Sequence, residues 1–313
     1  MTLKRITRRG AAWASALGSI GLGCAPLENA DLASDLERGA DAAREGAGAS
    51  SDGSGDGGGD AAAAVSPGCG ARDRSTTRAS TAAAMCRADA TPDLRISGDL
   101  IASGTERLDD LADLGCVCEV TRALYIYDLD LVDLSGFGGL ESVGLLELSR
   151  LPHFDRLEGA LALRSIGALV LVENGMLDDL SGLEGLESLG QLRVERNNLR
   201  DLSGLPEGLA VERLEVHHET RLESLAPLAL QPTTSELSLS ELRWLRDISS
   251  LQGAAHIELL SLTDLLVLEE IDVLRDVSTI GYVSIHTSPY LSSEDTGWLR
   301  EVADHGRVTG VSW

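Results

Sequence analysis

His217, His218 and Glu219 are the residues whose types best suit chemistry, and they are adjacent in the chain. Imidazole and carboxylate groups bind metal ions and transfer protons. Neighbouring residues of a strand point to opposite faces, however, so the two imidazoles of an extended segment cannot readily chelate one ion. The sequence holds no G-x-S-x-G or H-E-x-x-H motif, and Lys4 is its single lysine. We therefore expect no enzyme, no metal site and no cofactor.

The composition describes an acidic, aliphatic protein. The chain has 313 residues, of which 43% are hydrophobic and only 3% aromatic, so Leu, Val and Ile must form its core. Asp and Glu number 50 against 26 Lys and Arg, a formal charge of -24. A surface this acidic repels phosphate backbones and anionic headgroups, so nucleic acid is not an expected partner.

Residues 1–23 form a predicted signal peptide, with basic residues, no acidic ones, and then a stretch of apolar and small residues. The stretch ends in Ser-Ile-Gly-Leu-Gly-Cys at 19–24, which resembles the lipobox of bacterial lipoproteins. The resemblance implies that Cys24 is lipidated and that the protein meets the membrane only through this anchor, at the outer membrane or cell surface. Cleavage by an ordinary signal peptidase is the alternative, and it would release a periplasmic or extracellular protein.

Residues 24–66 are rich in Gly, Ala, Asp and Ser and form a predicted flexible tether, because so few apolar side chains cannot offset the loss of chain entropy. Lipidation of Cys24 leaves four cysteines, at Cys69, Cys86, Cys116 and Cys118. Since Cys116 and Cys118 stand too close together to pair without strain, we expect Cys69 and Cys86 to bond to them, in either order. A four-thiolate metal site is disfavoured by the 17-residue gap between Cys69 and Cys86. Residues 67–118 are the predicted N-terminal cap and first coil.

An apolar-x-apolar strand pattern recurs every 22 to 24 residues. Its first members are Leu100, Leu124, Leu146, Leu169, Leu192, Leu214, Leu237, Leu260 and Val283. The fullest unit, LSGLEGLESLGQLRVERNNL at 180–199, places a leucine at every third position and then alternates as a strand. This pattern resembles leucine-rich repeats and, within them, receptor L-domain-like proteins. The resemblance implies a β-rich right-handed solenoid of about nine coils with one parallel sheet, its repeats spanning 119–290.

Leucine-rich repeats usually stack an asparagine ladder after the strand, and only Asn174 and Asn197 occupy that position here. The other coils carry Leu129, Leu151, Glu219, Leu242, Leu265 and Ser288. We therefore expect the turns to close as in L-domain coils, without a regular row of convex helices. Residues 291–313 are the predicted C-terminal cap, with a helix over 293–306 that stops at Gly306 and a final strand over 308–313.

The strand positions between the buried ones should form the open face of the sheet. Two columns are predicted there, one running from Tyr125 to Ser284 and the next from Tyr127 to His286. The candidate binding residues on this face are Tyr125, Tyr127, Arg193, Glu195, His217, Tyr282 and His286. A solvated face with incidental rings is the alternative.

In five of the coils an acid stands just before the Leu or Ile that starts the arc after the strand; these acids are Asp133, Asp179, Asp201, Asp247 and Glu270. This column of acids predicts either caps for turn amides, which we favour, or a ladder of cation ligands.

Together these features predict a non-catalytic binding module, tethered to the bacterial envelope, that recognises an extracellular protein or carbohydrate. A self-associating structural component of the envelope is the alternative.

Overall fold

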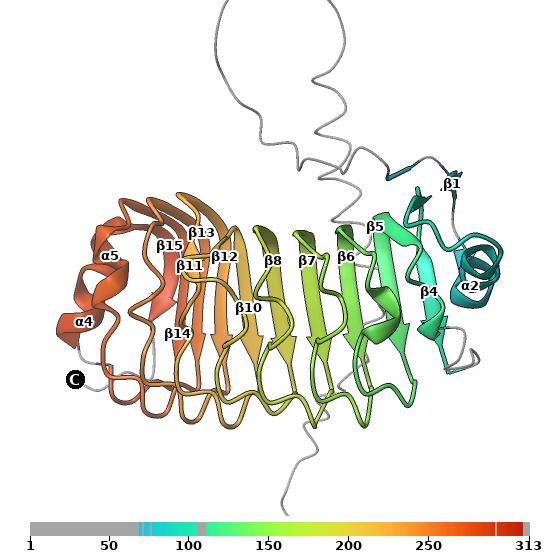
Figure 1. The fold of residues 1–313 in the computed structure, drawn as a ribbon. Coiled ribbons are helices and arrows are strands. Elements are labelled where there is room, and N and C mark those ends of the chain that lie inside the picture. The colour runs from blue at the N-terminus through green and yellow to red at the C-terminus, as the bar shows by residue number, and fades with distance from the viewer. Residues whose placement is uncertain (1–68, 71, 76, 105–110, 292, 309–313) are drawn as a thin grey trace, which may run out of the picture. The chain divides into compact units, whose positions relative to one another are not determined.

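The computed structural model describes residues 69–308 apart from 71, 76, 105–110 and 292. The predicted signal peptide, the tether and Cys24 lie outside these residues. The described chain is a parallel β-solenoid of about nine turns, with its coils stacked side by side and a helix near each end (Figure 1). The predicted fold class is confirmed.

One parallel sheet of 13 strands runs along the solenoid. Its strands at the N-terminal end are β1 (Arg72–Arg74), β2 (Thr77–Arg78), β3 (Leu94–Ile96), β4 (Leu100–Ser103) and β5 (Val117–Tyr127). The central strands are β6 (Ser142–Ser149), β7 (Ser165–Val172), β8 (Ser188–Glu195), β10 (Arg213–His217), β12 (Thr233–Ser240), β13 (His256–Thr263) and β14 (Thr279–His286), and β15 (Ala303–Val308) is the last. β9 (Ala210–Val211) and β11 (Ala229–Leu230) form a separate pair.

The strands of this sheet pair in the register that the sequence repeat predicts. The nine first members of the repeat pair in succession through eight pairings, from Leu100 with Leu124 to Leu260 with Val283. All nine are buried, with at most 3% of their surface exposed. Because one coil cannot cover its own apolar face, stacking of equivalent leucines builds the continuous core.

The leucines at every third position of the repeat form the tight arc opposite the sheet. In the fullest unit, Leu183 and Leu186 each donate a backbone hydrogen bond to the carbonyl three residues earlier, at 3.3 and 3.0 Å. Leu180, Leu183, Leu186 and Leu189 are all buried. Regular convex helices are not part of this arc, whose described helical pieces are the short 3-10 turns η1 (Ser135–Phe137) and η2 (Asp272–Asp276).

A residue in the left-handed backbone region follows each strand of the 13-stranded sheet from β5 to β14. These residues are Asp128, Arg150, Glu173, Arg196, His218, Glu241, Asp264 and Thr287, with φ between 48° and 58°. The N–H of each of the first seven donates to the carbonyl at the end of the next strand, as from Glu173 to Glu195 at 2.9 Å. The turn therefore extends the sheet ladder by one bond before the chain enters the arc.

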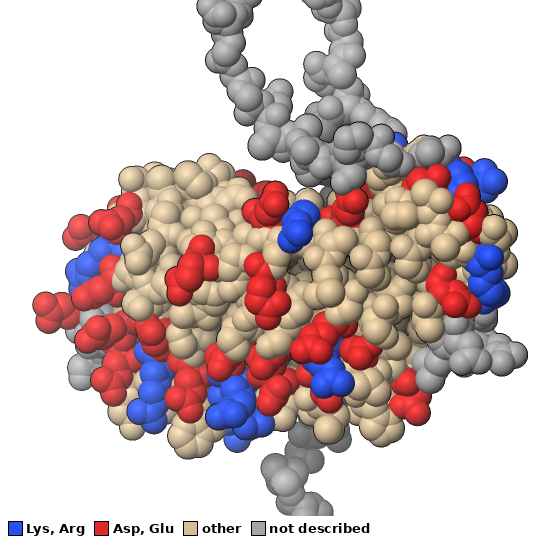
Figure 2. All heavy atoms as spheres, viewed as in Figure 1, with Lys and Arg blue, Asp and Glu red and all other residues tan. Residues whose placement is uncertain are grey.

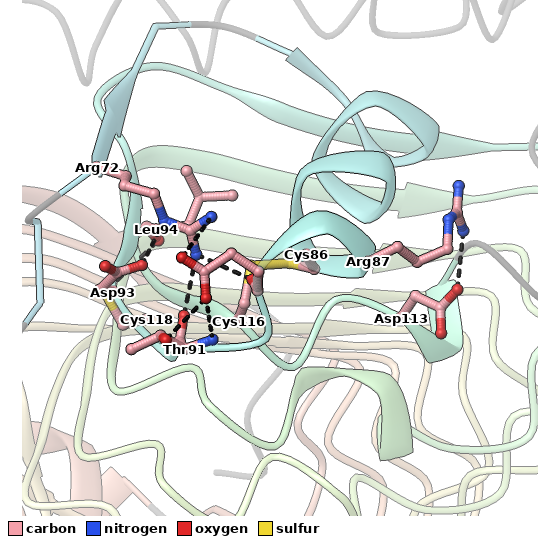
Figure 3. The surroundings of a disulfide bond; sticks show 10 residues. Arg72, Cys86, Arg87, Thr91, Asp93, Leu94, Asp113, Cys116 and Cys118 are labelled. Carbon is pink, nitrogen blue, oxygen red and sulfur yellow. Dashed lines mark hydrogen bonds and ion pairs between the residues drawn. A yellow bond between two sulfur atoms is a disulfide. The ribbon is translucent and has the colours of Figure 1, made fainter.

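In the N-terminal cap, the disulfide between Cys86 and Cys116 ties helix α2 (Ala79–Ala88) to the segment that leads into β5 (Figure 3). Cys69 pairs with Cys118 and Cys86 with Cys116, so the predicted crossed pairing is confirmed and its order is determined. Small side chains, Ala79, Ala82 and Ala83, form the buried side of α2. An Arg87–Asp113 ion pair of 2.8 Å joins the helix to the next segment.

The C-terminal cap has the predicted kinds of element with different bounds. Where a helix over 293–306 was predicted, the structure has two short pieces, α4 (Ser293–Gly297) and α5 (Leu299–Val302), followed by the strand β15 over 303–308. Residues 309–313 of the predicted final strand lie outside the described residues. Gly306 does not stop a helix; it pairs with Val283 of β14. The strand starts early because pairing with β14 gives partners to an edge that a longer helix would leave open.

The open face of the sheet

The outward strand positions form columns as predicted. Tyr125 of β5 pairs with Glu147 of β6, and the column continues strand by strand to Ser284 of β14. The second column runs without a break from Tyr127 to His286. A third outward column, which the sequence reasoning did not follow, is formed by Ala123, Leu145, Ala168, Gln191, Arg213, Glu236, Leu259 and Tyr282. The signal for it was present, because these residues stand two positions before those of the first column.

The N-terminal half of the open face carries an apolar cluster, beside which Glu147 pairs with Tyr125 and Val170. Ala123, Leu145, Ala168 and Val170 form a hydrophobic cluster separate from the main core, with Tyr125 and Val172 packed against it. Burial raises the pKa of the Tyr125 hydroxyl, and the charges of Asp99 and Glu147 raise it further. Tyr125 is thus a neutral, half-buried ring at the border of the cluster. The cluster and Tyr125 together are called the apolar patch below.

Tyr127 lies in the next column and carries a cation on its ring. The Arg150 guanidinium stands 5.9 Å from the ring centroid. Arg150 is itself held by Asp128, whose carboxylate accepts two hydrogen bonds from it at 2.7 and 2.9 Å. These hydrogen bonds lower the pKa of Asp128. An exposed ion pair therefore holds the cation beside the Tyr127 ring.

The centre of the open face is a network of charges. Arg193 donates to Glu195 at 2.9 Å and lies 3.9 Å from Glu215 of the next strand. His217 lies 3.8 Å from Glu215, and its Nδ1 lies 2.6 Å from the Ser240 hydroxyl. Three of the predicted binding residues, Arg193, Glu195 and His217, are thus brought together.

Two residues that sequence reasoning did not single out complete this charged network. Arg213 lies 3.8 Å from Glu215 and 3.5 Å from Glu236. Burial favours a higher pKa for Glu215, but His217, Arg193 and Arg213 outweigh it, so the pKa is lowered. Burial, helped by the charge of Glu215, raises the pKa of Glu236. The acids of the network therefore differ in how readily they accept a proton.

Tyr282 and His286 lie far from Tyr125 and Tyr127. Both are on β14, which is seven strands from Tyr125 and Tyr127 on β5. Seven spacings of about 4.8 Å separate these strands by about 34 Å along the sheet. Tyr282 is 45% exposed. The candidate residues therefore form one broad face with a separate aromatic end, and not one compact pocket.

The His217-His218-Glu219 triplet is divided among three environments. His217 is on the open face, His218 is the left-handed residue and pairs with Glu241 at 2.8 Å, and Glu219 is fully buried. Successive residues point apart, as expected for the end of a strand.

The column of acids caps turns. Asp133, Asp179, Asp201 and Asp247 each accept a hydrogen bond from the N–H of the serine two residues later, at 2.8 to 2.9 Å. The favoured capping interpretation is confirmed for these four. No such bond is described for Glu270, which precedes η2.

Replacing Asp179 with alanine should lower the free energy of unfolding by about 1 kcal/mol, because the Ser181 N–H loses its acceptor. Asp179→Asn keeps an acceptor oxygen and should cost less. Urea unfolding of the three proteins checks the order. A cation ladder would instead show as a rise in melting temperature with added calcium and a fall with chelator, and we expect neither.

The two disulfides indicate an oxidising, extracellular environment. Among the described residues, no helix combines the length and the apolarity needed to cross a bilayer. Acidic side chains outnumber basic ones on the surface shown in Figure 2, in keeping with the composition.

Searches against protein-family models, curated proteins and solved structures find no match, so what is established is the architecture: a disulfide-capped parallel β-solenoid.

Proposed function

We propose that this protein is a non-catalytic binding module of the bacterial cell envelope whose open sheet face recognises an extracellular protein or glycan. In this proposal the coils are leucine-rich repeats of the receptor L-domain kind, and Cys24 carries a lipid at the outer membrane or cell surface. The repeat, the disulfides and the acid-rich surface support an exported module.

The observation that carries the proposal is the pairing of the apolar patch with the charged network on one face. Interfaces commonly combine an apolar centre with charged residues that set orientation. Tyr125 and Arg193 belong to the residue types that most often dominate binding energy. The length of the face favours a macromolecule over a small ligand.

The test uses the full chain with Cys24→Ser, which blocks lipidation, as bait against envelope proteins and a glycan array. Tyr125→Ala and Arg193→Ala should each weaken binding of the retained partner about tenfold or more. Leu161→Ala is the matched control, because Leu161 is 74% exposed on the arc and away from the open face. Retention of nothing, or equal binding by all variants, would count against the proposal.

A structural, self-associating role predicts a different result. Concentration-dependent sedimentation of the same chain without any partner would favour it, since an open parallel sheet has two edges that can add strands.

The lipid anchor is tested by the intact mass of the membrane-extracted protein. An acyl mass on Cys24 is expected, and an unmodified N-terminus elsewhere would remove the anchor from the proposal.

A further inference from the structure

A second candidate site lies away from the open face, where the chain leaves the strands. A hollow of about 450 Å³ opens there, lined by Arg200, Asp201, Arg221, Glu223, Ser224 and Trp244. These residues follow β8, β10 and β12, so three successive coils build the hollow. Charged side chains gather along the lower edge in Figure 2, the edge toward which the arrows of β6, β7 and β8 point in Figure 1. The volume lies within the range of small-ligand sites.

Trp244 gives the hollow an apolar wall. The side chain is 51% exposed, although it stands between the buried Leu242 and Leu245. An exposed indole offers a flat apolar surface with a hydrogen-bond donor at its edge. The core does not require an aromatic side chain at this position, because the equivalent position of the preceding coil holds Arg221.

The two arginines of the hollow are available to a ligand. Across the part of the chain that the structure describes, Arg193 and Arg213 are held by carboxylates, whereas no ion pair or side-chain hydrogen bond is found for Arg200 or Arg221. A planar guanidinium binds a carboxylate or phosphate through two parallel hydrogen bonds. In a chain of charge -24, two unpaired arginines beside one hollow favour an anionic group there.

The acids of the hollow restrict what that anion can be. Asp201 is held in place by the Ser203 N–H at 2.9 Å and by the Ser203 hydroxyl. Glu223 adds a second carboxylate. Two carboxylates repel a multiply charged phosphate or an acidic peptide, but they accept hydrogen bonds from hydroxyl groups. The ligand that fits has an apolar face, several hydroxyls and a single carboxylate.

We infer that this hollow binds an acidic saccharide, a sugar unit of the hexuronic acid kind. The indole of Trp244 stacks on the C–H face of the ring, and Arg200 and Arg221 bind its carboxylate. Asp201 and Glu223 accept from its hydroxyls. The inference concerns a surface distinct from the open face and does not depend on the function proposed for that face.

The test is calorimetric titration of the full chain carrying Cys24→Ser with methyl glucuronide, which carries one carboxylate, followed in parallel by tryptophan fluorescence. The matched neutral probe is methyl glucoside, and inorganic phosphate and a short polyglutamate peptide test the other anion classes. We expect the uronide to bind and the neutral sugar to bind at least tenfold more weakly. Failure of the uronide to bind, or equal binding of the neutral sugar, phosphate or the peptide, would overturn the inference.

Two variants assign the binding to this hollow. Trp244→Ala and Arg221→Gln should each weaken uronide binding at least tenfold, and Trp244→Ala should also remove the fluorescence change. Tyr290→Ala is the control, because Tyr290 is 60% exposed on a later coil outside the hollow. Unchanged melting temperatures would show that the variants fold, as expected for exposed side chains. Equal losses in all three variants would place the binding elsewhere and refute the assignment.

Discussion

Replacing Gly182 with alanine should lower the free energy of unfolding by about 3 kcal/mol or more. Gly182 has a φ of +108°, a conformation that costs an L-residue free energy. An added Cβ would also lie 2.5 Å from the Glu158 nitrogen and the Leu157 carbonyl carbon. Both atoms belong to the backbone of the preceding coil, so neither can move aside without separating the two coils.

Urea unfolding with the disulfides intact measures the effect. Gly175→Ala is the matched control, because nothing lies within 4 Å of a Cβ at this exposed position, and it should change stability by no more than about 0.5 kcal/mol. Gly204, with φ of +98° and a Cβ position 2.2 Å from Leu180 backbone atoms, should behave like Gly182. Equal free energies of unfolding for Gly182→Ala and Gly175→Ala would contradict the close backbone approach of neighbouring coils at Gly182.

Replacing Glu219 with alanine should lower the free energy of unfolding by about 3 to 5 kcal/mol. Glu219 continues the asparagine ladder from Asn174 and Asn197. Its Oε1 accepts from the Asn197 N–H at 2.7 Å and the Asn197 side-chain amide at 3.1 Å, and its Oε2 accepts from the Leu199 N–H at 3.1 Å. Alanine would leave these buried donors without an acceptor and a cavity where the side chain stood.

The exposed Glu212→Ala is the control and should change stability little. The loss of unfolding free energy in Glu219→Gln should lie between those of Glu219→Ala and Glu212→Ala. The glutamine keeps one acceptor oxygen, but its side-chain nitrogen would face a backbone N–H that needs an acceptor. An unfolding free energy of Glu219→Ala equal to that of Glu212→Ala would contradict the role assigned to Glu219.

The same residue predicts a pH dependence. Burial raises the pKa of Glu219 more than its hydrogen bonds from Asn197 and Leu199 lower it. A carboxyl with a raised folded pKa contributes stability that is complete below its unfolded pKa, near about 4.3, and is lost as pH rises through the folded value. The stability advantage of the native chain over Glu219→Gln should therefore narrow as pH rises from about 4. An advantage that grows with pH would mean that the three N–H donors outweigh burial.

Periodicity predicted the fold because a parallel solenoid repeats one local environment. Leu146, Leu169 and Leu192 recur at a fixed spacing because each fills the same place in its coil, and their pairing follows from that spacing alone. The crossed disulfides followed from the short distance between Cys116 and Cys118. The bounds of the C-terminal cap did not follow, because a strand that completes the edge of β14 depends on contacts far away in sequence.

The sequence predicted the candidate sites less completely than it predicted the fold. Tyr125 and Arg193 were placed correctly on the open face, since alternation along a strand determines which side chains face outward. That Tyr282 and His286 of β14 do not meet Tyr125 of β5 is a property of the whole sheet, because the distance between these strands depends on how many strands lie between them. The left-handed turns were also missed, since residues such as Arg150 and Thr287 lack the glycine signature of that conformation.

The sequence by itself determined the repeat, the register and the inward or outward direction of each strand residue, because these depend only on spacing along the chain. Only the tertiary structure decided which cysteine pairs with which, that Glu219 is buried in the ladder, and that Arg200, Arg221 and Trp244 line one hollow. Those features arise between coils, where residues more than 20 positions apart meet, and a local pattern does not record which side chains will share a neighbour there.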